Sequence, residues 1–143
     1  MKLRYELTGY GWADCMIEVG EAAATLTASY LTDALDDLAG AVVALLRGDE
    51  QSTAIFAEEP GEYRWQFARK GLEGIEIRIH FVGHSTVRQP IFEAEVPLRT
   101  FATAVLFELQ RLLREYGVAE YKERWVLHDF PERRIDELTE LLT

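Results

Sequence analysis

The residues of this chain best suited to bind a metal or act as nucleophiles are His80, His84, His128 and Cys15. His80 and His84 are four residues apart, but the pattern around them places the first in a strand and the second in the loop that follows. Glu93 or Glu95 of the next strand could join them around an ion, yet an exposed strand histidine beside a loop histidine is the simpler interpretation. A lone cysteine forms neither an internal disulfide nor a thiolate zinc site. We therefore predict no metal site and no cofactor.

Residue patterns for nucleophilic or phosphate chemistry are missing from the sequence. His84 and Ser85 are neighbours in the chain, which says nothing about hydrogen-bond geometry, and no Gly-x-Ser-x-Gly turn occurs. Cys15 falls on the apolar side of its predicted strand, where a thiol is normally an inert small hydrophobe. No glycine-rich phosphate loop opens a helix, and solvation explains acidic doublets such as Glu58-Glu59. These observations favour a protein that is not an enzyme.

The polar side of the predicted strands is the surface of most interest. In the register that the alternation predicts, it displays Arg64, Glu76, Arg78 and His80, with Trp12 on the first group of strands. A solvated face with cross-strand ion pairs is one interpretation. A recognition surface is another, because arginine offers bidentate contacts and an exposed tryptophan is unusually apolar for bare solvent. A homodimer formed through the sheet face or a sheet edge is the third.

Strands must position these residues, and seven segments alternate between apolar and polar residues with period two. They are residues 3–8, 12–19, 24–30, 53–58, 63–68, 75–82 and 91–96. Short turns separate most of them, for example at Glu59-Pro60-Gly61-Glu62. Each segment has one apolar and one polar face, which fits an antiparallel sheet covered by helices on one side.

Helices are predicted where apolar residues recur every three or four positions, at about 32–47, at 98–116 and from Pro131 onward. The middle of the second helix, residues 103–109, carries only Glu108 as a charge and is predicted to be buried. Residues 118–129 fit either a helix or a packed extension. We predict one α+β domain, residues 1–143. Its fold would be an antiparallel meander of about seven strands with two to three helices on one face, in the order β-β-β-α-β-β-β-β-α-α.

Composition narrows the classes of partner and location. The chain has 143 residues, with 15 Lys and Arg against 25 Asp and Glu, and therefore a net charge of −10. Without a basic cluster, this charge argues against binding to nucleic acid. The longest apolar run, residues 41–46, is far too short to span a membrane, and the N-terminus has no apolar signal segment. We expect a cytoplasmic protein that binds neither nucleic acid nor membrane.

Four stretches of sequence resemble those of a known protein family. They are Leu3-Arg4-Tyr5-Glu6-Leu7-Thr8-Gly9, Ala28-Ser29-Tyr30-Leu31-Thr32-Asp33-Ala34-Leu35, Glu58-Glu59-Pro60-Gly61-Glu62-Tyr63-Arg64-Trp65 and Tyr121-Lys122-Glu123-Arg124-Trp125. The chain is similar over nearly its whole length to an uncharacterised family of small, mostly actinobacterial proteins. That family has no assigned activity. The resemblance implies a stand-alone bacterial protein and transfers no functional residue.

The function we expect is that of a non-enzymatic, acidic interaction domain. It would bind a protein partner through the exposed sheet face, as small acidic immunity proteins bind the toxins that they neutralise. The expected contact residues are Trp12, Arg64, Glu76, Arg78 and His80. One alternative is a small-ligand binder or enzyme with a pocket between sheet and helices, or at the loop of His84 and Ser85. A homodimeric structural protein is the other.

Overall fold

The strands form two antiparallel sheets in the computed structural model, which describes residues 1–83 and 90–143. The three-stranded sheet has the order β1-β2-β3 and consists of β1 (Lys2–Leu7), β2 (Trp12–Val19) and β3 (Ala22–Ser29). The four-stranded sheet has the order β4-β5-β6-β7 and consists of β4 (Gln51–Ala57), β5 (Glu62–Lys70), β6 (Gly74–Val82) and β7 (Phe92–Pro97). The helices are α1 (Ala34–Leu46), α2 (Leu98–Trp125) and α3 (Glu132–Leu142). No helix of the described residues has the length and apolar character to cross a membrane.

The α+β class and the order of elements are confirmed, whereas the single sheet of about seven strands is wrong. Consecutive strands pair within each sheet, but β3 and β4 are separated by α1, so no local turn joins them. The outer edge of β4 is also occupied by the start of α1. The amide of Ile55 donates to Oδ2 of Asp37 over 2.6 Å, and the amide of Ala57 donates to Oγ1 of Thr32 over 3.0 Å. These side chains take the amides that a neighbouring strand would need.

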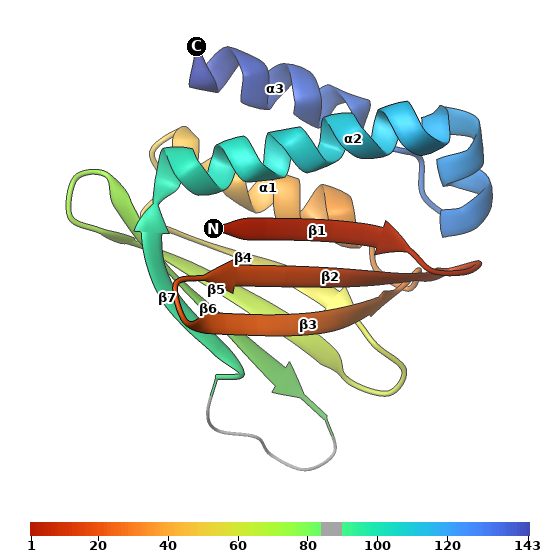
Figure 1. Ribbon diagram of the computed structural model, residues 1–143, viewed down its shortest axis with the longest axis horizontal. Helices are drawn as coiled ribbons and strands as arrows, with labels where there is room; N and C mark the ends of the chain where they lie inside the picture. Colours follow the sequence, from red (N-terminus) through yellow and green to blue (C-terminus); the bar gives the residue numbers. More distant parts are fainter. Residues whose placement is uncertain (84–89) are drawn as a thin grey trace.

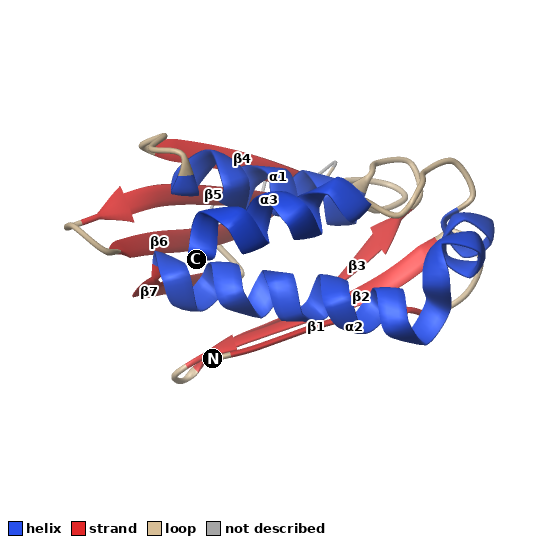
Figure 2. Ribbon diagram, turned by 90° about the horizontal axis from the view of Figure 1, so that it is seen from above, coloured by secondary structure: helices blue, strands red, loops and turns tan. Residues whose placement is uncertain are grey.

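The helices all lie on the inner side of the two sheets (Figure 1). Seen from above, α1 and α3 lie over the four-stranded sheet, and α2 runs along the three-stranded sheet (Figure 2). The two sheets come close at β3, which contacts β4 and β7. Side chains from both sheets and all three helices form one core, in which Ile77 and Phe67 are buried. The prediction that each sheet turns one apolar face inward is therefore confirmed.

The first part of helix α2 ends at Gly117, just after the predicted end of the helix at residue 116. Gly117 has φ 74° and ψ 168°, which interrupts the helix, but a further helical stretch continues to Trp125. The ambiguous region after Gly117 is thus mostly helical, and it buries Tyr121 and Trp125, which are four residues apart. The middle of α2 is not buried all round, because Phe107 is 62% exposed while Glu108 faces inward. This helix covers the core with one face only.

Helix α1 is anchored to the four-stranded sheet at both ends. The Thr32 hydroxyl just before the helix accepts the β4 hydrogen bond described above, and no side chain of the described residues caps the helix. At the other end, the Arg69 guanidinium of β5 donates to the carbonyl oxygens of Leu45 and Asp49. A cation at this end also opposes the negative pole of the helix dipole. The position of α1 therefore fixes the edge of β4.

Candidate functional site

The outer face of the four-stranded sheet brings most of the predicted contact residues together. Arg64 of β5 lies opposite His80 of β6, and Gln66 of β5 lies opposite Arg78 of β6. Glu76 is two residues from Arg78 on the same strand, so its side chain points to the same side. None of the three helices of the described residues covers this face (Figure 2). The predicted register is confirmed for these four predicted contact residues.

Arg78 stands between two carboxylates in the middle of this face. Its Nε atom is 3.0 Å from Oε1 of Glu76 and 3.2 Å from Oε2 of Glu93. Neither contact has hydrogen-bond geometry, and Arg78 makes no side-chain hydrogen bond within residues 1–83 and 90–143. Its guanidinium is thus held in place by charge while its N–H donors stay available. The predicted cross-strand ion pair, between β6 and β7, is confirmed.

A shallow depression of about 500 Å³ opens beside Arg78 on this face. Its polar lining consists of Gln51, Ser52, Thr53, Gln66, Glu76 and Arg78. It lies on the outer face of the sheet, whereas the small-ligand alternative predicted a pocket between the sheet and the helices.

The space between the four-stranded sheet and the helices is filled by side chains. There the rings of Trp65 and Phe67 are 6.0 Å apart, and those of Phe67 and Phe101 are 5.6 Å apart. The other alternative location, at His84 and Ser85, lies outside the described residues.

Trp12 does not belong to this face, contrary to the prediction. It begins β2 of the three-stranded sheet and pairs with Ser29 of β3. Alternation alone assigned it to the same side as Arg64, because a single continuous sheet was assumed. Splitting the strands into two sheets separates the two polar faces. Trp12 is still partly exposed, at the end of the molecule considered below.

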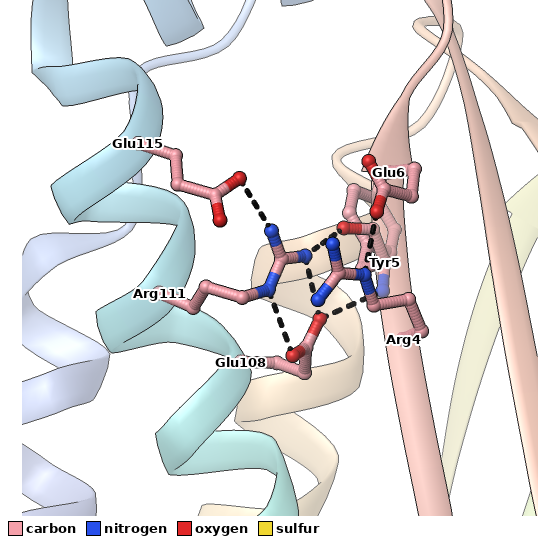
Figure 3. Close-up of polar contacts among 6 residues, drawn as sticks. All are labelled: Arg4, Tyr5, Glu6, Glu108, Arg111 and Glu115. Atoms are coloured by element: carbon pink, nitrogen blue, oxygen red, sulfur yellow. Dashed lines mark hydrogen bonds and ion pairs between the residues drawn. The ribbon is translucent and has the colours of Figure 1, made fainter.

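The outer edge of β1 is closed by two charged side chains that sequence reasoning did not single out (Figure 3). The amide of Tyr5 donates to Oε2 of Glu108 over 2.8 Å, and Nη2 of Arg111 donates to the carbonyl of Tyr5 over 2.6 Å. The two side chains also bond to each other over 2.8 Å. Farther along the strand, Nη2 of Arg124 donates to the carbonyl of Leu7 over 3.2 Å. The one sequence signal was a Glu and an Arg three residues apart on an otherwise apolar helix face.

The side chains with the most nucleophilic or proton-transfer potential lie elsewhere. Cys15 is fully buried, and burial, followed by the charge of Glu108, raises the pKa of its thiol. His128 follows α2, where its Nε2 atom is 2.9 Å from the carbonyl oxygen of Tyr30 and its Nδ1 atom is 3.8 Å from Oδ2 of Asp33. Asp33 and His128 are far apart in the sequence, which gave no sign of their proximity. No group of three His, Cys, Asp or Glu side chains in the described ranges is placed to hold a metal ion.

The comparisons with known proteins add no further information about this site. No family model matches the chain, and neither curated proteins nor solved structures contain a match.

Proposed function

We propose that this protein is a non-enzymatic interaction domain that binds a protein partner through the outer face of the four-stranded sheet. The observation that carries the proposal is the guanidinium of Arg78, which lies between Glu76 and Glu93 at an open depression of about 500 Å³. A guanidinium with free N–H donors can bind a carboxylate or a carbonyl of a partner. We also propose that the protein is bacterial and lies in the cytoplasm.

Two features of the fold support the sheet face over a sheet edge. A strand of a second copy could extend a sheet only through free backbone groups at its edge. Side chains of α2 take the Tyr5 and Leu7 groups of β1, and two amides of β4 are taken by Asp37 of α1 and by Thr32 just before it. The homodimer alternative is therefore less favoured at these two edges than recognition through the face.

The enzyme alternative has less support from the contacts than the interaction domain. Burial of Cys15 and the raised pKa of its thiol oppose its use as a nucleophile. Packed aromatic rings occupy the space in which an internal pocket was expected. The proposal accordingly assigns the charged groups of the sheet face to recognition rather than to proton transfer.

Site-specific photocrosslinking in the native host tests the proposal. A photoreactive residue replaces Gln66, which is exposed beside Arg78, and in a control chain it replaces Thr139, which is exposed on α3. We expect one discrete protein adduct from position 66 and none from position 139. Arg78→Ala should reduce the yield of that adduct and weaken binding of the identified partner by about tenfold or more. The same adducts from both positions, or no adduct from position 66, would rule out this face.

A further inference from the structure

A second surface, at one end of the molecule, collects exposed apolar side chains from three separate segments. We call it the end patch; it consists of Tyr10, Trp12, Leu31, Val126 and Leu127. Tyr10 is 70% exposed and Leu127 is 67% exposed. The turn between β1 and β2 and the last turns of α2 meet at this end, on the right in Figure 1. Exposed apolar side chains gathered in this way mark interaction surfaces more often than single ones do.

Backbone hydrogen bonds tie the three segments of the end patch together. The amide of Gly11 donates to the carbonyl of Arg124 over 2.6 Å, and the amide of Tyr30 donates to the carbonyl of Gly11 over 3.0 Å. His128 ties the segment of Val126 and Leu127 to Tyr30, since its Nε2 atom is 2.9 Å from the carbonyl oxygen of Tyr30. The exposed side chains are therefore carried by a connected backbone frame. A preformed surface of this kind needs little reordering when it binds.

The conformation of Val126 holds the apolar side chains of this segment outward. Val126 has φ 72° and ψ −64°, a region that a β-branched residue rarely adopts. The amide of Leu127 donates to the carbonyl of Trp125 over 2.8 Å, which makes a tight turn of the uncommon positive-φ type. Trp125 is fully buried while Val126 and Leu127 are exposed. Strained backbone of this kind persists when its surroundings hold it in place.

Acidic side chains border the end patch on one side. Leu127 lines a depression of about 510 Å³ together with four carboxylates, those of Asp33, Asp36, Asp129 and Glu132, and one cation, Arg133. Lys122 pairs with Asp129 and Arg134 pairs with Asp36, but Asp33 and Glu132 have no Lys or Arg partner in the described part of the chain. The rim therefore carries more carboxylates than cations next to apolar surface. An amphipathic segment with Lys or Arg beside apolar residues complements both properties.

We propose that the end patch and its acidic rim form a second docking surface, which takes a basic amphipathic segment of a partner protein. Apolar side chains of the segment would cover Leu127 and Val126, and its Lys or Arg side chains would enter the depression beside Asp33. No cluster of metal-ligating side chains lies in the described ranges, so the cation that fits is a side chain rather than a metal ion. This surface is separate from Arg78, and the inference does not depend on the proposed function.

Binding of a fluorescently labelled synthetic helical peptide of leucine and lysine, measured by anisotropy, tests the inference. Leu127→Ser should weaken binding by about tenfold, which corresponds to about 1.4 kcal/mol, because the bound peptide would bury the leucine side chain. The matched control is Leu72→Ser, because Leu72 is 97% exposed in the turn between β5 and β6. That change should leave the affinity unaltered. A peptide in which glutamate replaces lysine should bind at least about tenfold more weakly.

Three results would overturn the inference. The first is an equal effect of the Leu127 and Leu72 substitutions, which would indicate unspecific attraction to an acidic protein. The second is equal binding of the leucine–glutamate peptide. The third is a dimer, seen by light scattering, that Leu127→Ser abolishes, because the end patch would then be covered by a second copy. Arg78→Ala should not alter peptide binding, so failure of this inference and failure of the sheet-face proposal are distinguishable.

Discussion

Asp33 is a partly buried carboxylate whose polar groups are incompletely paired. Its Oδ1 atom is buried without a hydrogen-bond partner in the described residues, as is the hydroxyl of Tyr121. Burial, followed by the charge of Asp36, raises the pKa of the Asp33 carboxyl above its ordinary value of 3.8. A carboxyl with a raised pKa in the folded state destabilises that state whenever it is ionised. Asp33 therefore opposes folding at neutral pH, and this effect disappears as the pH falls through the raised pKa toward 3.8.

Asp33→Asn removes the ionisation while preserving the shape of the side chain. The difference in unfolding free energy, variant minus wild type, should be larger at neutral pH than below pH 3.8. Urea titrations at the two pH values measure it. Because His128 lies 3.8 Å from Asp33, the comparison is repeated with His128→Gln in both chains. A difference that is constant, or larger in acid, would contradict the assignment.

Individual residues were predictable where a local period determines their direction. Arg64, Arg78 and His80 share a face because side chains of a strand alternate with period two, whichever strands it pairs with. The proximity of Asp33 and His128 depends on how α1 meets the end of α2, and no local pattern encodes that contact. The prediction for Trp12 was wrong for the same reason, because the neighbours of Trp12 depend on which sheet contains β2.

At the scale of elements, side chains of the helices close the exposed edges of β1 and β4. An open strand edge pairs readily with another chain, and proteins commonly cover such edges. Glu108 satisfies the Tyr5 amide, and Arg111 satisfies the carbonyl of the same residue. Removing the Glu108 carboxylate leaves the Tyr5 amide without its acceptor and takes one acceptor from the Arg111 guanidinium. The Glu108–Arg111 pair therefore protects the β1 edge as well as fixing α2 against it.

Glu108→Ala should reduce the unfolding free energy by about 1–3 kcal/mol, the penalty for an unsatisfied buried group. Glu115→Ala is the matched control, because Glu115 contacts the same Arg111 from solvent at 2.7 Å. That change should lower stability by no more than about 0.5 kcal/mol. Hydrogen exchange of the Tyr5 amide should become faster only in the Glu108 variant. Equal losses in the two variants would show that the edge contact contributes nothing specific.

The elements themselves were more predictable than their assembly. Alternation located all seven strands to within a few residues, and apolar spacing located the helices, because both depend on local periods. Pairing across α1 was not encoded locally, so one sheet was predicted where two exist. The prediction that residues 103–109 are buried was wrong for Phe107, because hydrophobicity alone cannot distinguish a buried helix from a surface helix that buries one polar anchor.

For the whole molecule, the shared core implies that the two sheets unfold together. Helix α2 contacts β1 of one sheet and β7 of the other, and side chains of both sheets belong to a single buried cluster. Phe101 of α2 lies in that cluster, 5.6 Å from the ring of Phe67 in β5. Removal of the Phe101 ring should therefore destabilise the three-stranded sheet as well as the four-stranded sheet that the ring contacts. Small domains with one core generally unfold in a single cooperative step.

Phe101→Ala should lower the global unfolding free energy by about 3–5 kcal/mol, as expected for an aromatic side chain removed from a core. Native-state hydrogen exchange measures this loss separately for buried strands of each sheet, with Ile17 reporting on β2 and Phe67 on β5. Equal losses at the two amides are the expected result. Phe107→Ala, on the exposed side of the same helix, should change both by less than about 0.5 kcal/mol. A loss confined to β5 would mean that the sheets are independent folding units. A partner bound to one sheet face could then not stabilise the other sheet.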